Sequence, residues 1–298
     1  MSTTLVRPIA ATGARADRRL GQVALYALLA VLSLVSMFPF VWTFLSSGKE
    51  VSELYQIPPS LWPANPRFVE NYREVWTRVP FGQWLWNTFL VTVLSLVGSV
   101  LSASVVAYSF ARFRYPGRDL FFMVTLGTLM LPVEVTLIPQ YLLFKQLGWL
   151  DTFLPLIVPF WLGGGAFNIF LMRQFFMSIP YDLDEAARID GASSWRVFWQ
   201  ILLPLCKPAV ATMATLGFIS HWNSFLAPLI FINSESKYLV AVGLRYFSSG
   251  VTQGQAAARP QDHLLMGAAL MVALPCLVLF FLAQRYFVQG IVMSGIKG

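Results

Sequence analysis

The sequence predicts an all-α membrane protein with six transmembrane helices. Of its 298 residues, 57% are hydrophobic and only 12% are charged, and the mean hydropathy is +0.64. These values exclude an ordinary soluble domain. Six apolar segments are each long enough to cross a bilayer as a helix. They cover approximately residues 20–46, 85–110, 120–144, 153–172, 207–232 and 264–287.

The remaining segments are expected to divide between the two sides of a membrane domain that covers residues 20–288. They are an N-terminal tail (1–19), outer loops (47–84 and 233–263), a polar loop (178–207) and a C-terminal tail (289–298). An excess of Lys and Arg marks the cytoplasmic side of a membrane protein. With both termini in the cytosol, 13 of the 21 Lys and Arg residues fall on that side and 8 fall outside. Cytosolic loops therefore explain the net charge of +7, and no nucleic-acid partner is expected.

The N-terminal third begins with a polar tail that shows no hydrophobic period, so we expect this tail to be loosely ordered. The first apolar segment is too long for a signal-peptide core and lacks a convincing A-x-A cleavage site, which predicts an uncleaved span. Outer loop 47–84 combines several prolines with balanced charges and many aromatic residues. This composition predicts an ordered segment with little regular structure.

The second and third spans differ in the residues that they carry. Small residues recur through the second span, which predicts close packing inside the bundle: Ser95, Gly98, Ser99, Ser102, Ala103 and Ser104. The third span contains Pro132, Pro139 and Glu134, the only carboxylate inside an apolar segment. An intramembrane acid is a candidate for lining a transport pathway. Alternatively, Glu134 lies near the outer end, hydrated or hydrogen-bonded to backbone that the prolines free.

The fourth and fifth spans hold the other pathway candidates. Three consecutive glycines, residues 163–165, permit a helix break or a close helix contact, and Asn168 faces the pathway or makes an interhelical hydrogen bond. The fifth span places polar side chains in hydrocarbon, where they must be satisfied internally or face a cavity: Ser220, His221, Trp222, Asn223 and Ser224. His221 lacks partner ligands, so no metal site is expected.

Two features of the last third concern order and covalent linkage. Outer loop 233–263 is rich in Gly, Ser and Gln, so part of it is expected to be mobile. Cys206 and Cys276 lie near the start of one apolar segment and in the middle of another. We therefore expect the two sulfurs at different depths, without a disulfide.

One polar stretch, residues 182–204, separates the fourth and fifth spans. Its first turns carry carboxylates that complement the positive end of a helix dipole: Asp182, Asp184 and Glu185. After Asp190, Gly191 can adopt the left-handed conformation that ends a helix, and Ser193 or Ser194 can cap a second helix. The stretch therefore predicts a helix, a tight turn and another helix.

Both predicted helices of this stretch have an apolar side. These sides consist of Leu183, Ala186 and Ala187 in the first helix, and Trp195, Phe198, Trp199 and Leu202 in the second. Such a pair can lie in a groove on a partner protein, where the small alanines allow backbones to approach closely. The alternative is an interfacial loop that rests on lipid headgroups.

The fixed positions of the stretch resemble a known signature. Glu185-Ala186-Ala187, then Gly191 after three further residues, and Ile201, Leu203 and Pro204 after nine more resemble the EAA signature of ABC importer permeases. The resemblance covers nearly the whole chain and extends to the carbohydrate-uptake type, within it to the maltose-type second permease subunit. It implies a type I ABC importer permease fold in which residues 178–207 form a cytoplasmic coupling-helix loop.

The same resemblance implies a site, partners and a location. In that family the coupling helix sits in a cleft of a cytosolic ATPase, which assigns docking to Asp184, Glu185, Ala186, Ala187, Asp190, Gly191, Trp195 and Phe198. The implied partners are a second permease subunit, two cytoplasmic ATPase subunits that bind ATP and Mg, an extracytoplasmic substrate-binding protein and membrane lipids. The chain itself is expected to bind no cofactor and to lie in a bacterial inner membrane.

Catalytic motifs are absent from the sequence, including H-E-x-x-H, G-x-S-x-G and the G-x-x-x-x-G-K-[ST] phosphate loop. We therefore expect the chain not to be an enzyme. The resemblance implies a transport subunit that forms half of a pathway for a sugar, oligosaccharide or related polyol. One alternative is an ion-coupled secondary transporter in which Glu134 and His221 relay protons. Another is a membrane enzyme that uses the same two groups. Both alternatives leave the signature unexplained.

Overall fold

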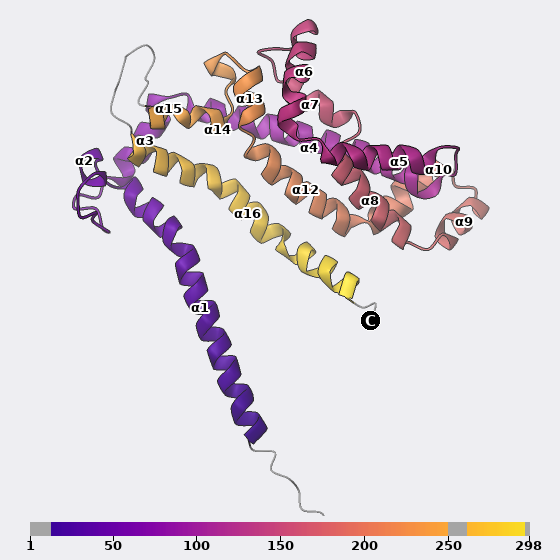
Figure 1. Ribbon diagram of the computed structural model, residues 1–298, viewed down its shortest axis with the longest axis horizontal. Helices are drawn as coiled ribbons and strands as arrows, with labels where there is room; N and C mark the ends of the chain where they lie inside the picture. Colours follow the sequence, from indigo (N-terminus) through magenta and orange to yellow (C-terminus); the bar gives the residue numbers. More distant parts are fainter. Residues whose placement is uncertain (1–12, 250–260, 296–298) are drawn as a thin grey trace, which may run out of the picture.

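The computed structural model describes residues 13–249 and 261–295, and most of them fall in helices (Figure 1). The elements are α1 (Gly13–Ser47), α2 (Val51–Leu54), α3 (Phe68–Arg78), α4 (Phe81–Arg112), α5 (Arg118–Gly127), η1 (Thr128–Met130), α6 (Val133–Gln146), α7 (Leu154–Trp161), α8 (Ala166–Ser178), α9 (Asp182–Ile189), α10 (Ser194–Arg196), η2 (Val197–Leu202), α11 (Leu203–Leu205), α12 (Lys207–Trp222), α13 (Leu226–Phe231), η3 (Glu235–Lys237), α14 (Val240–Gly243), α15 (Arg245–Ser249) and α16 (Asp262–Gly295). The predicted all-α class is confirmed.

Four helical segments in the described part of the chain are long and apolar enough to span a membrane: Gly21–Ser47, Phe81–Arg112, Leu154–Ser178 and Asp262–Gln284. The number becomes six if each of two bent pairs counts as one span. In the first pair, α5–η1 meets α6 at 100°; in the second, α10–α11 meets α12 at 76°. The third predicted span is thus broken at Pro132, because proline has no N–H to continue a helix. The fifth predicted span ends early, since α12 stops at Trp222.

Helix α4 runs unbroken along the body, as predicted for a span inside the bundle (Figure 1). Its serine hydroxyls donate to backbone carbonyls of the α7–α8 segment: Ser95 to Leu156 (2.8 Å), Ser99 to Gly164 (2.8 Å) and Ser102 to Phe160 (2.9 Å). Gly164 has a φ of 70°, in the break between α7 and α8. Serines of α4 therefore satisfy carbonyl groups that would otherwise lack partners in an apolar environment.

Outer segment 47–84 contains more regular structure than its composition predicted. The prolines of this segment precede α3 or follow it, which leaves Phe68–Arg78 free to form a helix. Asn71 and Val75 of α3 are buried, and the Asn71 amide donates to the backbone carbonyls of Ser47 (2.8 Å) and Lys49 (3.1 Å). The expectation of little regular structure was wrong. The few residues on the buried face of this short helix are interspersed in the sequence with charged and aromatic residues, so they do not form a recognisable helical pattern.

Outer loop 233–263 is also more ordered than its composition suggested. Leu239, Val240 and Phe247 are at most 1% exposed. Gly243 lies against Trp84 so closely that a Cβ there would come within 2.2 Å of the indole ring. The first half of the loop is therefore packed onto α4, while residues 250–260, where mobility was also predicted, lie outside the described residues.

The two terminal helices extend beyond the predicted spans. Helix α1 begins at Gly13, inside the tail predicted to be loosely ordered, and residues 1–12 lie outside the described residues. Helix α16 continues to Gly295, through most of the predicted C-terminal tail. Figure 1 shows α1 extending away from the remaining helices. In the apolar window of α1 none of the residues is buried.

The α4 contact at Gly164 generates a test of this packing. A Cβ on Gly164 would lie 2.2 Å from the Ser99 carbonyl oxygen and 2.7 Å from the Ala103 Cβ, whereas one on Gly165 meets nothing within 4 Å. Both glycines have positive φ, 70° and 88°, so both substitutions carry backbone strain. Gly164→Ala should lose an additional 1–3 kcal/mol, roughly, through overpacking.

Size-exclusion chromatography in detergent, with yield of monodisperse protein as the readout, compares Gly164→Ala with Gly165→Ala. We expect the Gly164 variant to give the lower yield. Equal yields would contradict the close contact between α4 and the glycine break.

Candidate functional site

The predicted helix–turn–helix is present in residues 182–205. Helix α9 ends at Ile189, and Gly191, two residues later, has a left-handed φ of 81°. The N–H of Ala192 then donates to the Ala187 carbonyl (2.9 Å), which closes the end of the helix. Ser193 caps the next helix, because its hydroxyl accepts a hydrogen bond from the Arg196 N–H (3.3 Å). The turn chemistry read from the sequence is confirmed.

The second helix of the pair is continuous but not uniformly α-helical. It passes from α10 through a π-helical turn, η2, into α11. A π-turn widens the helix and is frequent at functional sites. Pro204 follows within α11, and the chain then bends into α12 by 76°. The pair is therefore joined directly to a membrane-spanning helix.

The apolar sides of the pair face the protein's own bundle. Phe198 is fully buried, with its ring 5.1 Å from the Tyr108 ring of α4. Ala187 is 8% exposed and belongs to the same apolar cluster. Ala187 and Phe198, both in the predicted docking set, therefore pack inside their own chain, and their docking role stays a prediction. A sequence pattern gives the apolar side of a helix but not the body that covers it.

Asp184, another residue of the predicted docking set, is also buried within the chain. Its side chain has no exposed surface, and its carboxylate forms an ion pair with Arg112 at the end of α4 (3.2 Å). Arg112 also donates from Nη2 to the Ile179 carbonyl (3.0 Å). Burial raises the pKa of the Asp184 carboxyl, and the Arg112 guanidinium opposes this effect. Sequence reasoning missed this pair, since no spacing rule connects residues 112 and 184.

The other predicted docking residues lie on the exposed edge of the helix pair. Glu185, Ala186, Asp190, Gly191 and Trp195 are all exposed. Two large apolar side chains join them, since Ile189 is 85% exposed and Trp195 is 56% exposed. An open cavity of about 570 Å³ lies beside Glu185, with Arg112, Arg114, Arg118, Tyr181 and Arg188 among its lining residues. This exposed edge combines apolar side chains with charges of both signs, which suits contact with another protein.

The pathway candidates separate into packed and exposed side chains. Trp222 is buried and its indole N–H donates to the Val272 carbonyl (3.0 Å). The Asn168 amide donates to the Ser99 hydroxyl (2.9 Å) and to the Gly164 carbonyl (2.8 Å). The interhelical alternative is therefore the one observed for Asn168, which is half-buried, whereas Trp222 is buried.

Three other candidates keep some exposure. Glu134 is exposed, in the first turn of α6 just after the bend at Pro132. Asn223 is exposed and donates to the Ile219 carbonyl (2.8 Å). His221 is half-buried, with its ring 4.4 Å from the Phe160 ring in an edge-to-face arrangement.

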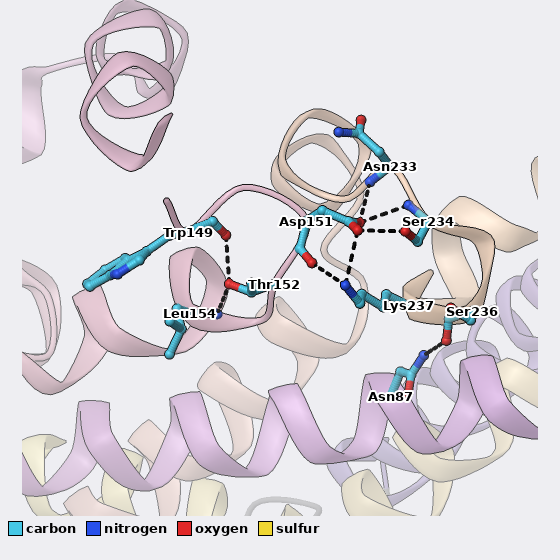
Figure 2. A network of polar contacts seen from close by, with 9 residues as sticks. All are labelled: Asn87, Trp149, Asp151, Thr152, Leu154, Asn233, Ser234, Ser236 and Lys237. Atoms are coloured by element: carbon cyan, nitrogen blue, oxygen red, sulfur yellow. Dashed lines mark hydrogen bonds and ion pairs between the residues drawn. The ribbon is translucent and has the colours of Figure 1, made fainter. Parts of the chain in front are cut away.

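A polar network that joins the turn at Asp151 to residues 233–237 was not predicted (Figure 2). Asp151 has a φ of 58° and lies in the turn between α6 and α7. Its carboxylate accepts hydrogen bonds from the N–H groups of Asn233 (3.0 Å) and Ser234 (2.8 Å), from the Ser234 hydroxyl (2.6 Å) and from the Lys237 ammonium (3.0 Å). These donors, led by the Ser234 hydroxyl, hold the pKa of the Asp151 carboxyl well below its usual range.

The network connects two outer turns with α4. Lys237 also donates to the Asp151 carbonyl (2.6 Å), and the Asn87 amide of α4 donates to the carbonyls of Ser236 (2.9 Å) and Tyr238 (3.1 Å). Figure 2 shows Asn87 on α4 below these turns. A non-glycine residue in the left-handed region cannot be recognised from sequence alone, so Asp151 gave no signal.

Comparison with known proteins identifies the family. The family described as "Binding-protein-dependent transport system inner membrane component" matches residues 99–293, which include the helix pair and the Gly191 turn. The chain belongs to this family. It is therefore the permease subunit of a binding-protein-dependent ABC importer and not itself an enzyme. The alternatives of a secondary transporter and a membrane enzyme are thereby excluded.

Relatives align with the permease over almost its whole length. The sn-glycerol-3-phosphate transport system permease protein UgpE of Yersinia enterocolitica is 34% identical over 284 residues, 93% of this chain and 98% of that protein. The diacetylchitobiose uptake system permease protein NgcG of Streptomyces coelicolor is 34% identical over 288 residues, 96% of this chain and 92% of that protein.

A solved structure supports the same fold. The crystal structure of a bacterial ABC transporter involved in the import of the acidic polysaccharide alginate has a chain that matches with a TM-score of 0.79 and 27% identity. The match covers 94% of this permease and all of that chain. The predicted importer fold is confirmed, and the protein is a multi-pass inner-membrane component of an importer that contains a binding protein and an ATPase.

The Asp151 network generates a pH-dependent test of stability. Because the pKa of Asp151 in the folded protein lies below the unfolded value of about 3.9, its contribution is present above that value and is lost as pH falls. Asp151→Asn should lower the melting temperature by a few degrees at pH 7, and the deficit should shrink toward pH 3.

The protein is heated in detergent at neutral pH with a fluorogenic maleimide, which reacts with the buried Cys206 thiol once unfolding exposes it and so reports the melting temperature. Below neutral pH, intrinsic fluorescence reports the melting temperature instead. Glu50→Gln, which removes one partner of the exposed pair with Arg67, is the control and should change little. A deficit that stays constant from pH 7 to pH 3 would contradict the role of the Asp151 carboxylate.

Proposed function

We propose that the helix pair in residues 178–207 is the coupling loop of this permease and docks on a cytoplasmic ATPase subunit. The observation that carries the proposal is the exposed edge on which the signature residues Glu185, Ala186 and Gly191 lie beside Ile189 and Trp195. Exposed isoleucine and tryptophan on a short polar element favour a protein interface over solvent. Asp184, Ala187 and Phe198 serve this site from inside, since they hold the pair against α4.

The proposed mechanism is alternating access. ATP and Mg bind to two ATPase subunits, whose closure displaces the docked helix pair. The direct connection of the pair to α8 and α12 transmits the displacement to the membrane helices, and the pathway switches between inward-facing and outward-facing states. This orientation requires both chain termini on the cytoplasmic side.

We propose that this permease pairs with a second permease subunit, each chain forming half of the pathway. The apolar window of α1, in which the chain itself buries no residue, supports a covering by lipid and by that second chain, because large exposed apolar surfaces mark interaction sites. An extracytoplasmic binding protein delivers the solute to the pair. Glu134, His221 and Asn223 remain the candidates for lining the pathway.

The proposed substrate is a sugar, oligosaccharide or related polyol. Support comes from the names of its relatives, which concern glycerol 3-phosphate, diacetylchitobiose and alginate. Each of these molecules carries hydroxyl groups that hydrogen-bonding side chains can bind, and two of them, glycerol 3-phosphate and the acidic polysaccharide alginate, also carry negative charge.

Charge reversal at the proposed interface tests docking. Glu185→Lys should reduce the ATPase that copurifies with the permease by about tenfold or more, because a misplaced charge at an interface costs several kcal/mol. Glu70→Lys on exposed α3 makes the same change in net charge at the outer side and is the control. Equal recovery of ATPase with both variants would remove Glu185 from the interface.

The Gly191 turn provides a second test. Proline cannot adopt the φ of 81° found there, and the misfit costs on the order of 3 kcal/mol, enough to deplete the correct turn about 100-fold. Gly191→Pro should therefore abolish ATPase assembly or its stimulation by the binding protein. Gly191→Asn, which tolerates left-handed φ, should retain both activities. Normal stimulation in the proline variant would contradict the assigned geometry.

A further inference from the structure

Two side chains one helical turn apart hold both halves of the helix pair against the end of α4. The Tyr108 hydroxyl donates to the Ser194 carbonyl at the start of α10 (3.1 Å). Arg112 donates to the Ile179 carbonyl just before α9 and forms the ion pair with Asp184 in the first turn of α9. We call Tyr108, Arg112 and Asp184 the α4 clamp.

The clamp is enclosed by protein. Tyr108 is 3% exposed, and the side chains of Arg112 and Asp184 are 4% and 0% exposed. A buried ion pair loses hydration that its mutual attraction only partly restores, so it is weak evidence for a contribution to stability. What it does provide is a fixed position, because separating the charges would leave each one buried without its partner. The pair therefore fixes α9 relative to α4.

The opposite end of α4 is fastened to the outer loop. The Trp84 indole donates to the Glu235 carbonyl (3.0 Å), the Asn87 amide donates to Ser236, and the Thr88 hydroxyl accepts from the Val240 N–H (2.8 Å). Figure 2 shows the contact between Asn87 and Ser236. The 32 residues of α4 extend over about 48 Å as a helix. One continuous element thus contacts the helix pair at one end and the outer loop at the other.

We propose that the α4 clamp transmits movement of the coupling loop into α4 and, through α4, to the outer loop at residues 235–240. The inference rests on the proposed function, in which an ATPase moves the helix pair. The three clamp residues are positioning residues: they are covered by their own chain and touch neither the ATPase nor the solute. Without the clamp, the helix pair can follow the ATPase while α4 remains in place.

The test replaces the ion pair with apolar side chains of similar size, a change that buried ion pairs often tolerate. The double variant is Arg112→Met with Asp184→Leu. The control is Arg67→Met with Glu50→Leu, which removes a pair outside the helix pair whose side chains are 51% and 41% exposed. Both are made in a permease with Cys206 and Cys276 replaced by serine and with a fluorophore on Ser236→Cys, and each is purified with its ATPase.

The readouts are the amount of copurified ATPase, the rate of ATP hydrolysis and the change in fluorophore emission on addition of Mg-ATP. In the double variant we expect the amount of copurified ATPase to equal that of the control and the rate of ATP hydrolysis to lie within about twofold of it. The emission change should be at least about fivefold smaller than in the control, since fivefold is the lower limit of typical allosteric coupling. Tyr108→Phe, which removes only a hydroxyl, should give an intermediate emission change.

An emission change in the double variant equal to that of the control would overturn the inference. So would loss of assembly in the double variant with an unchanged signal in Tyr108→Phe, because the clamp would then serve folding alone. Failure of the proposed function would give a different result, since no ATPase would then copurify with the unsubstituted permease.

Discussion

The structure depends on side chains of α4 that pair with backbone groups released where other segments break or turn. Serines of α4 donate hydrogen bonds to backbone carbonyls near the α7–α8 break, and Asn87 donates to a backbone carbonyl of the outer turn. Tyr108 and Arg112 do the same for the helix pair. In hydrocarbon an unpaired backbone group costs several kcal/mol, so broken helices are tolerated only against such a partner. The continuity of α4 is what permits the irregularity of its neighbours.

Much of the fold followed from local sequence chemistry. The apolar segments gave the spans, Gly191 gave a left-handed turn, and Ser193 gave a cap because each feature depends on residues close in the chain. The burial of Phe198 and the pairing of Arg112 with Asp184 could not be predicted, since both depend on α4, which is distant in sequence. The amphipathic α3 was hidden for another reason: one turn of buried residues is too short a pattern to stand out.

The site shows the same division between local and distant information. The signature located the exposed edge of the helix pair, but it did not distinguish side chains that face a partner from those that face α4. The structure makes that separation at Glu185 and Asp184, adjacent residues of which one is exposed and the other fully buried. We propose a different role for each: Glu185 contacts the ATPase subunit, and Asp184 holds the helix pair in place.

The most direct test is whether the helix pair and outer segment 47–84 lie on opposite sides of the membrane. Ile189 on α9 is 85% exposed and Ile57 in the outer segment is 96% exposed, so a single cysteine at either position will react freely. In a permease with Cys206 and Cys276 replaced by serine, a membrane-impermeant maleimide should label Ile57→Cys in intact spheroplasts and Ile189→Cys only in inside-out vesicles. Labelling of both positions from the same side, or in the reverse order, would contradict a helix pair that meets an ATPase in the cytosol.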